Sequence, residues 1–136
     1  MTLKKLAGAL MAAGLGIAAF SAHAQVSGDK VKIGYITDLS GLYADIDGQG
    51  GVEAVKMAIE DAGGKVLGKP IELVTADHQN KADIAASKAR EWMDQQGIDM
   101  LLGGTNSATS LAMSKVAAEK KRPFIAIGAG TARLTN

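Results

Sequence analysis

Apolar and polar residues follow one another along this chain in segments that predict four strands and three helices. Short apolar runs rich in β-branched residues, bounded by glycine or polar residues, predict strands over 31–36, 71–76, 99–102 and 123–127. Apolar residues that recur every three or four positions predict helices. These cover 52–62, the segment from the capping stretch Asn80–Asp83 to a stop at Gly97, and 107–120. The stretch 37–51, rich in Gly, Asp and Ser, is expected to be a loop.

The order of these elements, β-α-β-α-β-α-β, predicts an α/β fold: a parallel sheet flanked by helices, with right-handed crossovers. Ligands of such sheets bind outside the carboxyl ends of the strands. Those ends are the loops 37–51, 77–80, 103–107 and 128–131. The sequence stops soon after the fourth strand, without a helix to cover it, so we expect a fragment of a longer protein.

The first 24 residues have the pattern of a secretory signal peptide. A basic start (Met1–Lys5) precedes the uncharged run Leu6–Phe20, and Ala22 and Ala24 give the A-x-A pattern of a cleavage site. The alternative is a membrane anchor, but 15 residues are short of the roughly 20 that span a bilayer. We therefore expect an exported chain, cleaved after Ala24, with no stable membrane insertion after processing.

Composition excludes several classes of function. The 15 basic and 14 acidic residues leave a formal charge of +1, which gives no reason to expect nucleic-acid binding. The absence of cysteine excludes disulfides, cysteine zinc sites and a thiol nucleophile. A dinucleotide fingerprint fails because Glu53 stands where Gly48-x-Gly50 requires a third glycine.

No set of residues predicts a metal, a cofactor or catalysis. Asp45-x-Asp47 imitates the opening of a calcium loop, but Lys56 occupies the position of the chelating glutamate. His78 is the one histidine after the leader, and we interpret it as a surface-loop residue. With no second His or Cys, and no nucleophile–base pair, the expectation is a protein that is not an enzyme and has no cofactor or metal.

Two groups of small polar residues at strand ends are the candidate site. Thr105-Asn106-Ser107, at the start of the third helix, can present hydroxyl, amide and free backbone N–H groups to an anion such as a carboxylate. Gly128–Thr131 offers backbone carbonyls and one hydroxyl, which suit an ammonium group. Residues of these types also serve as helix caps and turns, so the sequence leaves both interpretations open.

An ordered set of short motifs from Lys30 to Thr135 resembles the periplasmic substrate-binding proteins of ABC transporters, of the branched-chain amino-acid (leucine-binding) type. The motifs are Lys32-Ile33-Gly34-Tyr35, Leu39-Ser40-Gly41, Gly51-x-Glu53-x-x-x-x-Ala58, Gly63-Gly64, Gly68–Leu73, Ala76-Asp77, Leu101-Leu102-Gly103, Gly128–Thr131 and Leu134-Thr135.

The resemblance implies that 25–136 is most of the first lobe of a two-lobed type I binding protein, with the second lobe missing. It implies that the ligand lies between the lobes, with Ser107 on its carboxylate and with Ala129 and Thr131 accepting from its amino group. Tyr43 would reach over the ligand, and Asn106 belongs to the same set. Gly128 and Gly130 replace a frequent proline and a frequent alanine of the family.

The function implied is a periplasmic receptor that delivers an amino acid, or another small and possibly aromatic carboxylate, to an ABC permease. The segment 105–108 differs from the Ser-rich run of leucine binders, so leucine itself is not implied. Two alternatives remain: a ligand sensor of the same fold for a signalling partner, and an exported α/β enzyme.

Overall fold

The computed structural model describes residue 26 and residues 28–135, so the expected signal peptide (1–24) lies outside the described residues. The elements along the chain are β1 (Val31–Thr37), α1 (Ala44–Asp47), α2 (Gln49–Asp61), β2 (Lys65–Val66), β3 (Lys69–Asp77), α3 (Ala82–Glu91), a π-helical turn (Trp92–Gln96), β4 (Met100–Gly103), α4 (Ser107–Glu119), β5 (Phe124–Ala126) and a 3₁₀ turn (Ala132–Leu134). None of the helices in these ranges has the length and apolar character needed to cross a membrane.

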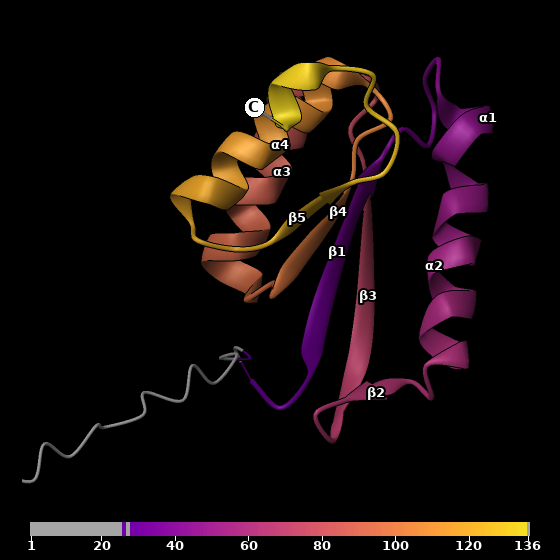
Figure 1. Cartoon of the computed structure of the whole chain (residues 1–136), viewed down its shortest axis with the longest axis vertical. Coiled ribbons are helices and arrows are strands. Elements are labelled where there is room, and N and C mark those ends of the chain that lie inside the picture. The colour runs from indigo at the N-terminus through magenta and orange to yellow at the C-terminus, as the bar shows by residue number, and fades with distance from the viewer. Residues whose placement is uncertain (1–25, 27, 136) are drawn as a thin grey trace, which may run out of the picture.

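One five-stranded sheet, in the order β2-β3-β1-β4-β5, organises the described residues (Figure 1). All pairs are parallel except the short β2–β3 pair. The central strand β1 pairs with β3 from Val31↔Ile71 to Thr37↔Asp77, and with β4 along its other edge. The predicted α/β class, with a mostly parallel sheet flanked by helices, is confirmed.

The face of the sheet under α3 and α4, here called the closed face, carries the core (Figure 1). Ile36 and Leu101 from the strands are fully buried there against helix residues, which are Ala85, Ala89, Trp92, Met113 and Val116. Gly34 allows this packing, because a Cβ at this position would lie 2.8 Å from the Trp92 ring. The predicted apolar stripes of these two helices therefore do face the sheet.

The opposite face, here called the open face, carries α2 (Figure 1). Val52 is the one buried residue of this helix, and Val55 and Ile59 are half-buried. Between α2 and the strands lies an apolar groove of about 470 Å³, lined among others by Ile33, Tyr35, Leu102 and Ile127. The open face is thus only partly covered in the described part of the chain.

The prediction that 37–51 is a loop is wrong for the second half of this segment. Residues 44–47 form α1, and α2 begins at Gln49, three residues before the predicted start. Glycine is needed at position 51 of α2, because Gly51 packs against the hydroxyl of Tyr35 and a Cβ there would collide with it. The Tyr35 hydroxyl in turn donates to the backbone carbonyl of Asp47 (2.7 Å).

Two further elements were not expected. Residues 65–69 form a hairpin of β2 with the start of β3, and Leu67 and Gly68 at its tip both have positive φ (52° and 76°).

The second predicted helix does stop at Gly97, which is left-handed (φ 65°), but its last turn is π-helical. Its start is wrong: Asn80 has φ 56° and does not cap, and the capping position is Lys81, without a side-chain bond.

Candidate functional site

The loops that follow β1, β4 and β5 leave the same end of the sheet, because these strands are parallel (Figure 1). The loops after β4 and β5 contact one another directly. The Ile127 N–H donates to the Gly103 carbonyl (3.3 Å), and Gly128 is so close that a Cβ there would lie 3.6 Å from Thr105 Cα. The segments that hold Ser107 and Thr131 are therefore neighbours at the carboxyl ends of β4 and β5.

A double-glycine turn sets the direction in which α4 begins. Gly103 and Gly104 have φ of +139° and +88°, a region that favours glycine. The Ser110 hydroxyl donates to the Gly104 carbonyl (2.5 Å), and a Cβ on Gly104 would collide with that hydroxyl. The turn thus fixes the N-terminus of α4 at the carboxyl end of β4.

Asn106 is the N-cap of α4, which corrects part of the expected anion site. Its Oδ1 accepts from the N–H groups of Ala108 (2.7 Å) and Thr109 (3.3 Å), so these two donors are not free for a ligand. Ser107, the first helical residue, is half-buried, and its hydroxyl forms no hydrogen bond to a described residue. Of the predicted set, Ser107 keeps the group available for a ligand, while Asn106 serves the helix.

Thr131 also has a local role. Its Oγ1 accepts from the Arg133 N–H (3.3 Å) and caps the 3₁₀ turn, while its hydroxyl proton remains available. Ala129 and Thr131 are both half-buried at this end of the sheet. The helix-capping interpretation is therefore correct for Asn106 and Thr131.

Tyr43 lies on the loop after β1 and is half-buried. The buried Asp38 carboxylate holds this loop, because it accepts from the N–H groups of Gly41 (2.8 Å) and Tyr43 (2.9 Å). β1 pairs with β4 in the sheet, so the loop that carries Tyr43 and the segment that carries Ser107 leave neighbouring strands at the same end. All five predicted site residues thus lie on loops or helix starts at one end of the sheet.

His78, expected on the surface, is buried, with 1% of its side chain exposed. Its N–H donates to the Thr37 carbonyl (2.9 Å), which draws the residue under the loop after β1. Burial lowers the pKa of His78 below its ordinary value, although the charges of Asp38, Asp47 and Asp77 act to raise it. The signal that sequence reasoning missed is the place of His78 directly after β3, the strand that pairs with the central strand β1.

Asp77, the last residue of β3, joins the same region. It accepts from the Leu39 N–H (3.0 Å), the Gln79 N–H (2.7 Å) and the Ser40 hydroxyl (2.5 Å). Burial raises the pKa of this carboxyl, but these hydrogen bonds together outweigh it and leave the pKa below its usual range. Asp77 therefore ties the loops after β1 and β3 together as a charged acceptor.

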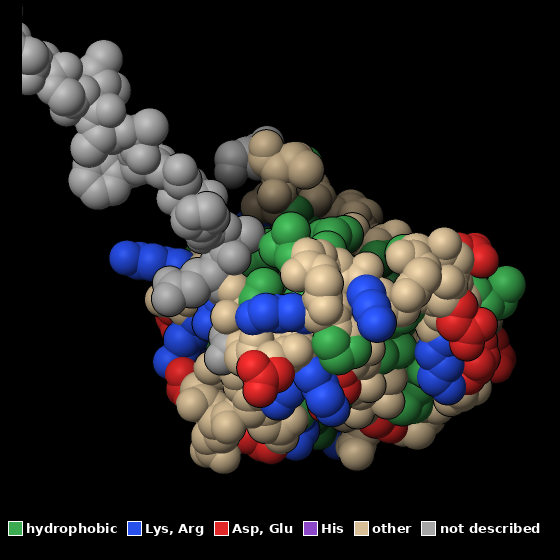
Figure 2. Space-filling model, turned by 90° about the horizontal axis from the view of Figure 1, so that it is seen from below, with side chains coloured by type: hydrophobic (Ala, Val, Ile, Leu, Met, Phe, Trp, Pro, Cys, Tyr) green, Lys and Arg blue, Asp and Glu red, His purple; other side chains and the backbone are tan. Residues whose placement is uncertain are grey.

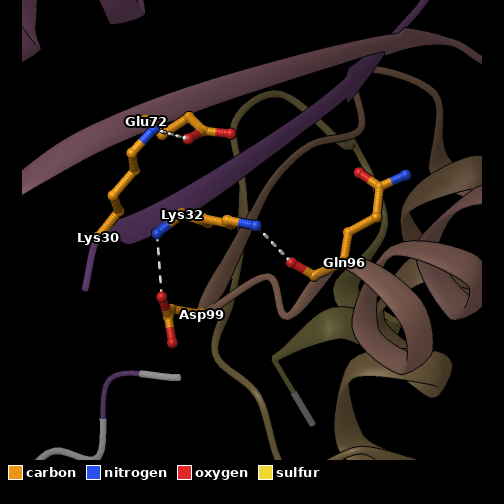
Figure 3. Close-up of polar contacts among 5 residues, drawn as sticks. All are labelled: Lys30, Lys32, Glu72, Gln96 and Asp99. Carbon is orange, nitrogen blue, oxygen red and sulfur yellow. Dashed lines mark hydrogen bonds and ion pairs between the residues drawn. The ribbon is translucent and has the colours of Figure 1, made fainter. Parts of the chain in front are cut away.

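The opposite end of the sheet has a polar hollow of about 320 Å³, whose cations are already paired (Figure 3). Lys30 forms an ion pair with Glu72 (2.8 Å), and Lys32 Nζ donates to the Gln96 carbonyl (2.8 Å). The Lys32 N–H donates to Asp99 (2.9 Å). Figure 2 shows basic and acidic side chains intermixed across this end. The lysines of this hollow therefore serve to hold the strands and the neighbouring turn together.

Across residues 28–135, no three histidine or acidic side chains come together as a metal site. Burial raises the pKa of Tyr35, whose hydroxyl donates to the Asp47 carbonyl.

The family model described as "Periplasmic binding protein" matches residues 30–136. Among curated proteins, none matches the chain. The match to the family covers more than half of the chain and includes every predicted site residue.

Solved structures give the same fold. A periplasmic binding protein from Burkholderia mallei is 75% identical (TM-score 0.77) over 79% of this chain and 29% of its own. The branched-chain amino-acid transporter substrate-binding protein LivJ from Streptococcus pneumoniae, in complex with isoleucine, is 27% identical (TM-score 0.71) over 78% and 31%.

A third structure contains a different ligand. The solute-binding protein of an ABC transporter from Rhodopseudomonas palustris, in complex with 3,4-dihydroxybenzoic acid, is 29% identical (TM-score 0.74) over 79% of this chain and 30% of its own. The described fold is that of type I periplasmic binding proteins, and the chain spans less than a third of the length of these relatives.

Proposed function

Because this chain belongs to the periplasmic binding protein family, we propose that it is part of a solute receptor that delivers a small carboxylate to an ABC importer. In this proposal residues 1–24 are the signal peptide, and 25–136 are most of the first of two lobes. The mature protein works in the periplasm. The observation that carries the proposal is the helix N-terminus at Ser107, set beside the 128–131 loop at the carboxyl ends of the strands.

Ser107 is the proposed contact to the ligand's carboxylate. A hydroxyl on the first residue of a helix points its proton where the helix dipole also favours negative charge. Two of the nearby N–H groups are taken by Asn106, so the Ser107 hydroxyl supplies a larger share of the binding. Ala129 and Thr131 face a second group of the ligand, and Tyr43 supplies an aromatic contact from the next loop.

Two ligand classes fit this half-site, an α-amino acid and an aromatic carboxylate. Relatives with isoleucine and with 3,4-dihydroxybenzoic acid support the two classes about equally at 27% and 29% identity. In both classes the carboxylate is the shared group, so Ser107 is proposed to act in either case. The groups around Ala129 and Thr131 separate the classes, since only an amino acid brings an ammonium there.

The test is calorimetric titration of the intact exported protein with isoleucine and, separately, with 3,4-dihydroxybenzoate. Ser107→Ala is expected to weaken binding of the ligand that is accepted by about 1–3 kcal/mol, the loss for a hydrogen bond to a charged group. Ser114→Ala, on the same helix but half-buried beside the 3₁₀ turn, is the matched control and leaves affinity unchanged. Equal affinities for wild type and Ser107→Ala would remove Ser107 from the site.

A further inference from the structure

Packing among the described residues does not explain why positions 128 and 130 are glycine. Gly104, by contrast, must be glycine, because its φ is +88° and a Cβ there would collide with the Ser110 hydroxyl. Gly128 and Gly130 do not have positive φ. The nearest atoms that a Cβ on Gly128 would meet lie at 3.6 Å, an ordinary contact distance, and a Cβ on Gly130 would meet nothing within 4 Å. In the described part of the chain, alanine would therefore fit at both positions.

Glycine without a structural need has a cost, because glycine loses more conformational freedom on folding than any other residue. Its two common uses are a backbone with positive φ and the close approach of a backbone to a ligand. The first use does not apply to Gly128. The second use agrees with its position, since Gly128 begins the loop 128–131 of the candidate site.

A side chain at position 128 would point toward the segment that holds Ser107. An ideal Cβ on Gly128 would contact Thr105 at three atoms, Cα, Cγ2 and Oγ1, each at 3.6 Å. Thr105 lies two residues before Ser107 on the loop after β4. Because residue 128 is glycine, it places no side chain between the loops after β4 and β5. A ligand held by Ser107 can therefore extend along the backbone of Gly128.

The groups around Gly128 suit a flat ring better than an ammonium group. Thr105 is half-buried, its methyl group lies toward position 128, and its hydroxyl forms no hydrogen bond to a described residue. The peptide at a glycine is flat and has no side chain, so a ring can lie close against it. The segments 103–107 and 128–131 contain no Asp or Glu, so neither offers a charged partner to an ammonium group.

We propose that Gly128 is a specificity-determining residue, which admits the ring of an aromatic carboxylate beside Thr105 and so favours this class of ligand over an α-amino acid. The carboxylate of the ligand lies at Ser107, and the ring extends along the peptide of Gly128. A methyl group at position 128 would occupy the space of the ring. The inference rests on the proposed function, because it takes the carboxylate contact of Ser107 from it.

The experiment is calorimetric titration of the intact exported protein with 3,4-dihydroxybenzoate and, separately, with isoleucine. The wild type is expected to prefer 3,4-dihydroxybenzoate. Gly128→Ala is expected to weaken the binding of 3,4-dihydroxybenzoate by about tenfold or more, the effect of one methyl group in a closely packed pocket. Gly28→Ala, at the opposite end of the sheet, is the matched control, since its Cβ would also meet nothing that excludes it, and it leaves the affinity unchanged.

Thermal unfolding of the same variants separates ligand specificity from stability. Both alanine variants are expected to unfold at the wild-type temperature or slightly above it, because alanine fits at both positions and restricts the unfolded chain. A less stable Gly128→Ala variant would mean that the fold itself needs this glycine, and overturns the proposal. An unchanged affinity of Gly128→Ala for 3,4-dihydroxybenzoate overturns it as well, and so does a wild type that prefers isoleucine or binds neither compound.

The titration of Ser107→Ala distinguishes this inference from the proposed function. A wild type that prefers isoleucine, with binding weakened by Ser107→Ala, supports the proposed function and overturns the role of Gly128. If Ser107→Ala binds 3,4-dihydroxybenzoate like the wild type while Gly128→Ala binds it more weakly, the ring does lie beside Gly128 and the carboxylate contact of Ser107 is wrong.

Discussion

The closed and open faces of the sheet differ in how completely helices cover them, although the same strands supply both. Leu101 and Leu102 are consecutive residues of β4, and successive strand residues point to opposite faces. Leu101 is fully buried beneath α3 and α4, while Leu102 is half-buried beside the groove under α2. Ile125 and Ile127 are also 49% and 48% exposed. This difference indicates that, among the described residues, the closed face contributes most of the stability.

The largest expected effect follows from removing each leucine in turn. Leu101→Ala is expected to lower the free energy of unfolding by about 2–5 kcal/mol, since it leaves a cavity among tightly packed side chains. Leu102→Ala is expected to lower the free energy of unfolding by clearly less, because the groove that Leu102 faces is already open and no enclosed cavity forms. Urea denaturation of both variants measures the difference. Equal losses would mean that the two faces contribute alike.

The pH dependence of stability is a second test of the closed face, because the buried His78 lies just before α3, a helix of that face. Its pKa is lowered in the folded protein, so the unfolded chain binds more protons once the pH falls below its ordinary pKa, about 6.5. The contribution of the neutral, buried His78 to the free energy of unfolding is therefore fully present above that pH. It falls toward acid by at most about 1.4 kcal/mol per pH unit for one proton.

Trp92, the one tryptophan of the chain, is 4% exposed on the closed face and reports this loss through its fluorescence. Denaturant titrations at pH 7 and pH 5.5 would give the two stabilities. In His78→Gln the slope of stability against pH between these values is expected to shrink. An unchanged slope in the variant would assign the acid sensitivity to other groups.

The smallest effect is expected on the open face. Ile127→Ser replaces a side chain that is about half exposed, so stability should change by no more than about 0.5 kcal/mol. An apolar dye that binds the groove should bind the variant more weakly. Dye fluorescence and thermal unfolding test both statements, and a large loss of stability would show that the groove is part of the core.

The fold was predictable where a helix or strand is decided by its own periodicity. The helix 107–120 ends one residue from its observed limit, and the apolar stripe of α3 lies where its spacing places it. The hairpin at 65–69 was not predictable from periodicity, because β2 has two residues. Residues 44–51 were wrongly predicted as a loop because Gly51, which looks like a loop residue in the sequence, packs in α2 against Tyr35, a residue distant in the sequence.

The candidate site was predictable in place but only partly in chemistry. The parallel order of strands brings Ser107 and Thr131 to one end, as the pattern implies. Sequence alone could not show that the Asn106 Oδ1 accepts from the N–H groups of its own helix, since caps and ligand sites favour the same residues. The burial of His78 depends on the Thr37 carbonyl of another strand, a contact that no local pattern encodes.

The hairpin tip at Leu67 has a practical consequence for handling the protein on a surface. Leu67 is 71% exposed and lies at the end of the sheet opposite the candidate site (Figure 1). The sequence contains no cysteine, so Leu67→Cys would introduce a unique attachment point for a thiol-reactive chip. A molecule anchored there would hold Ser107 and Thr131 toward free solution, an orientation that suits a surface assay of the proposed binding of small carboxylates.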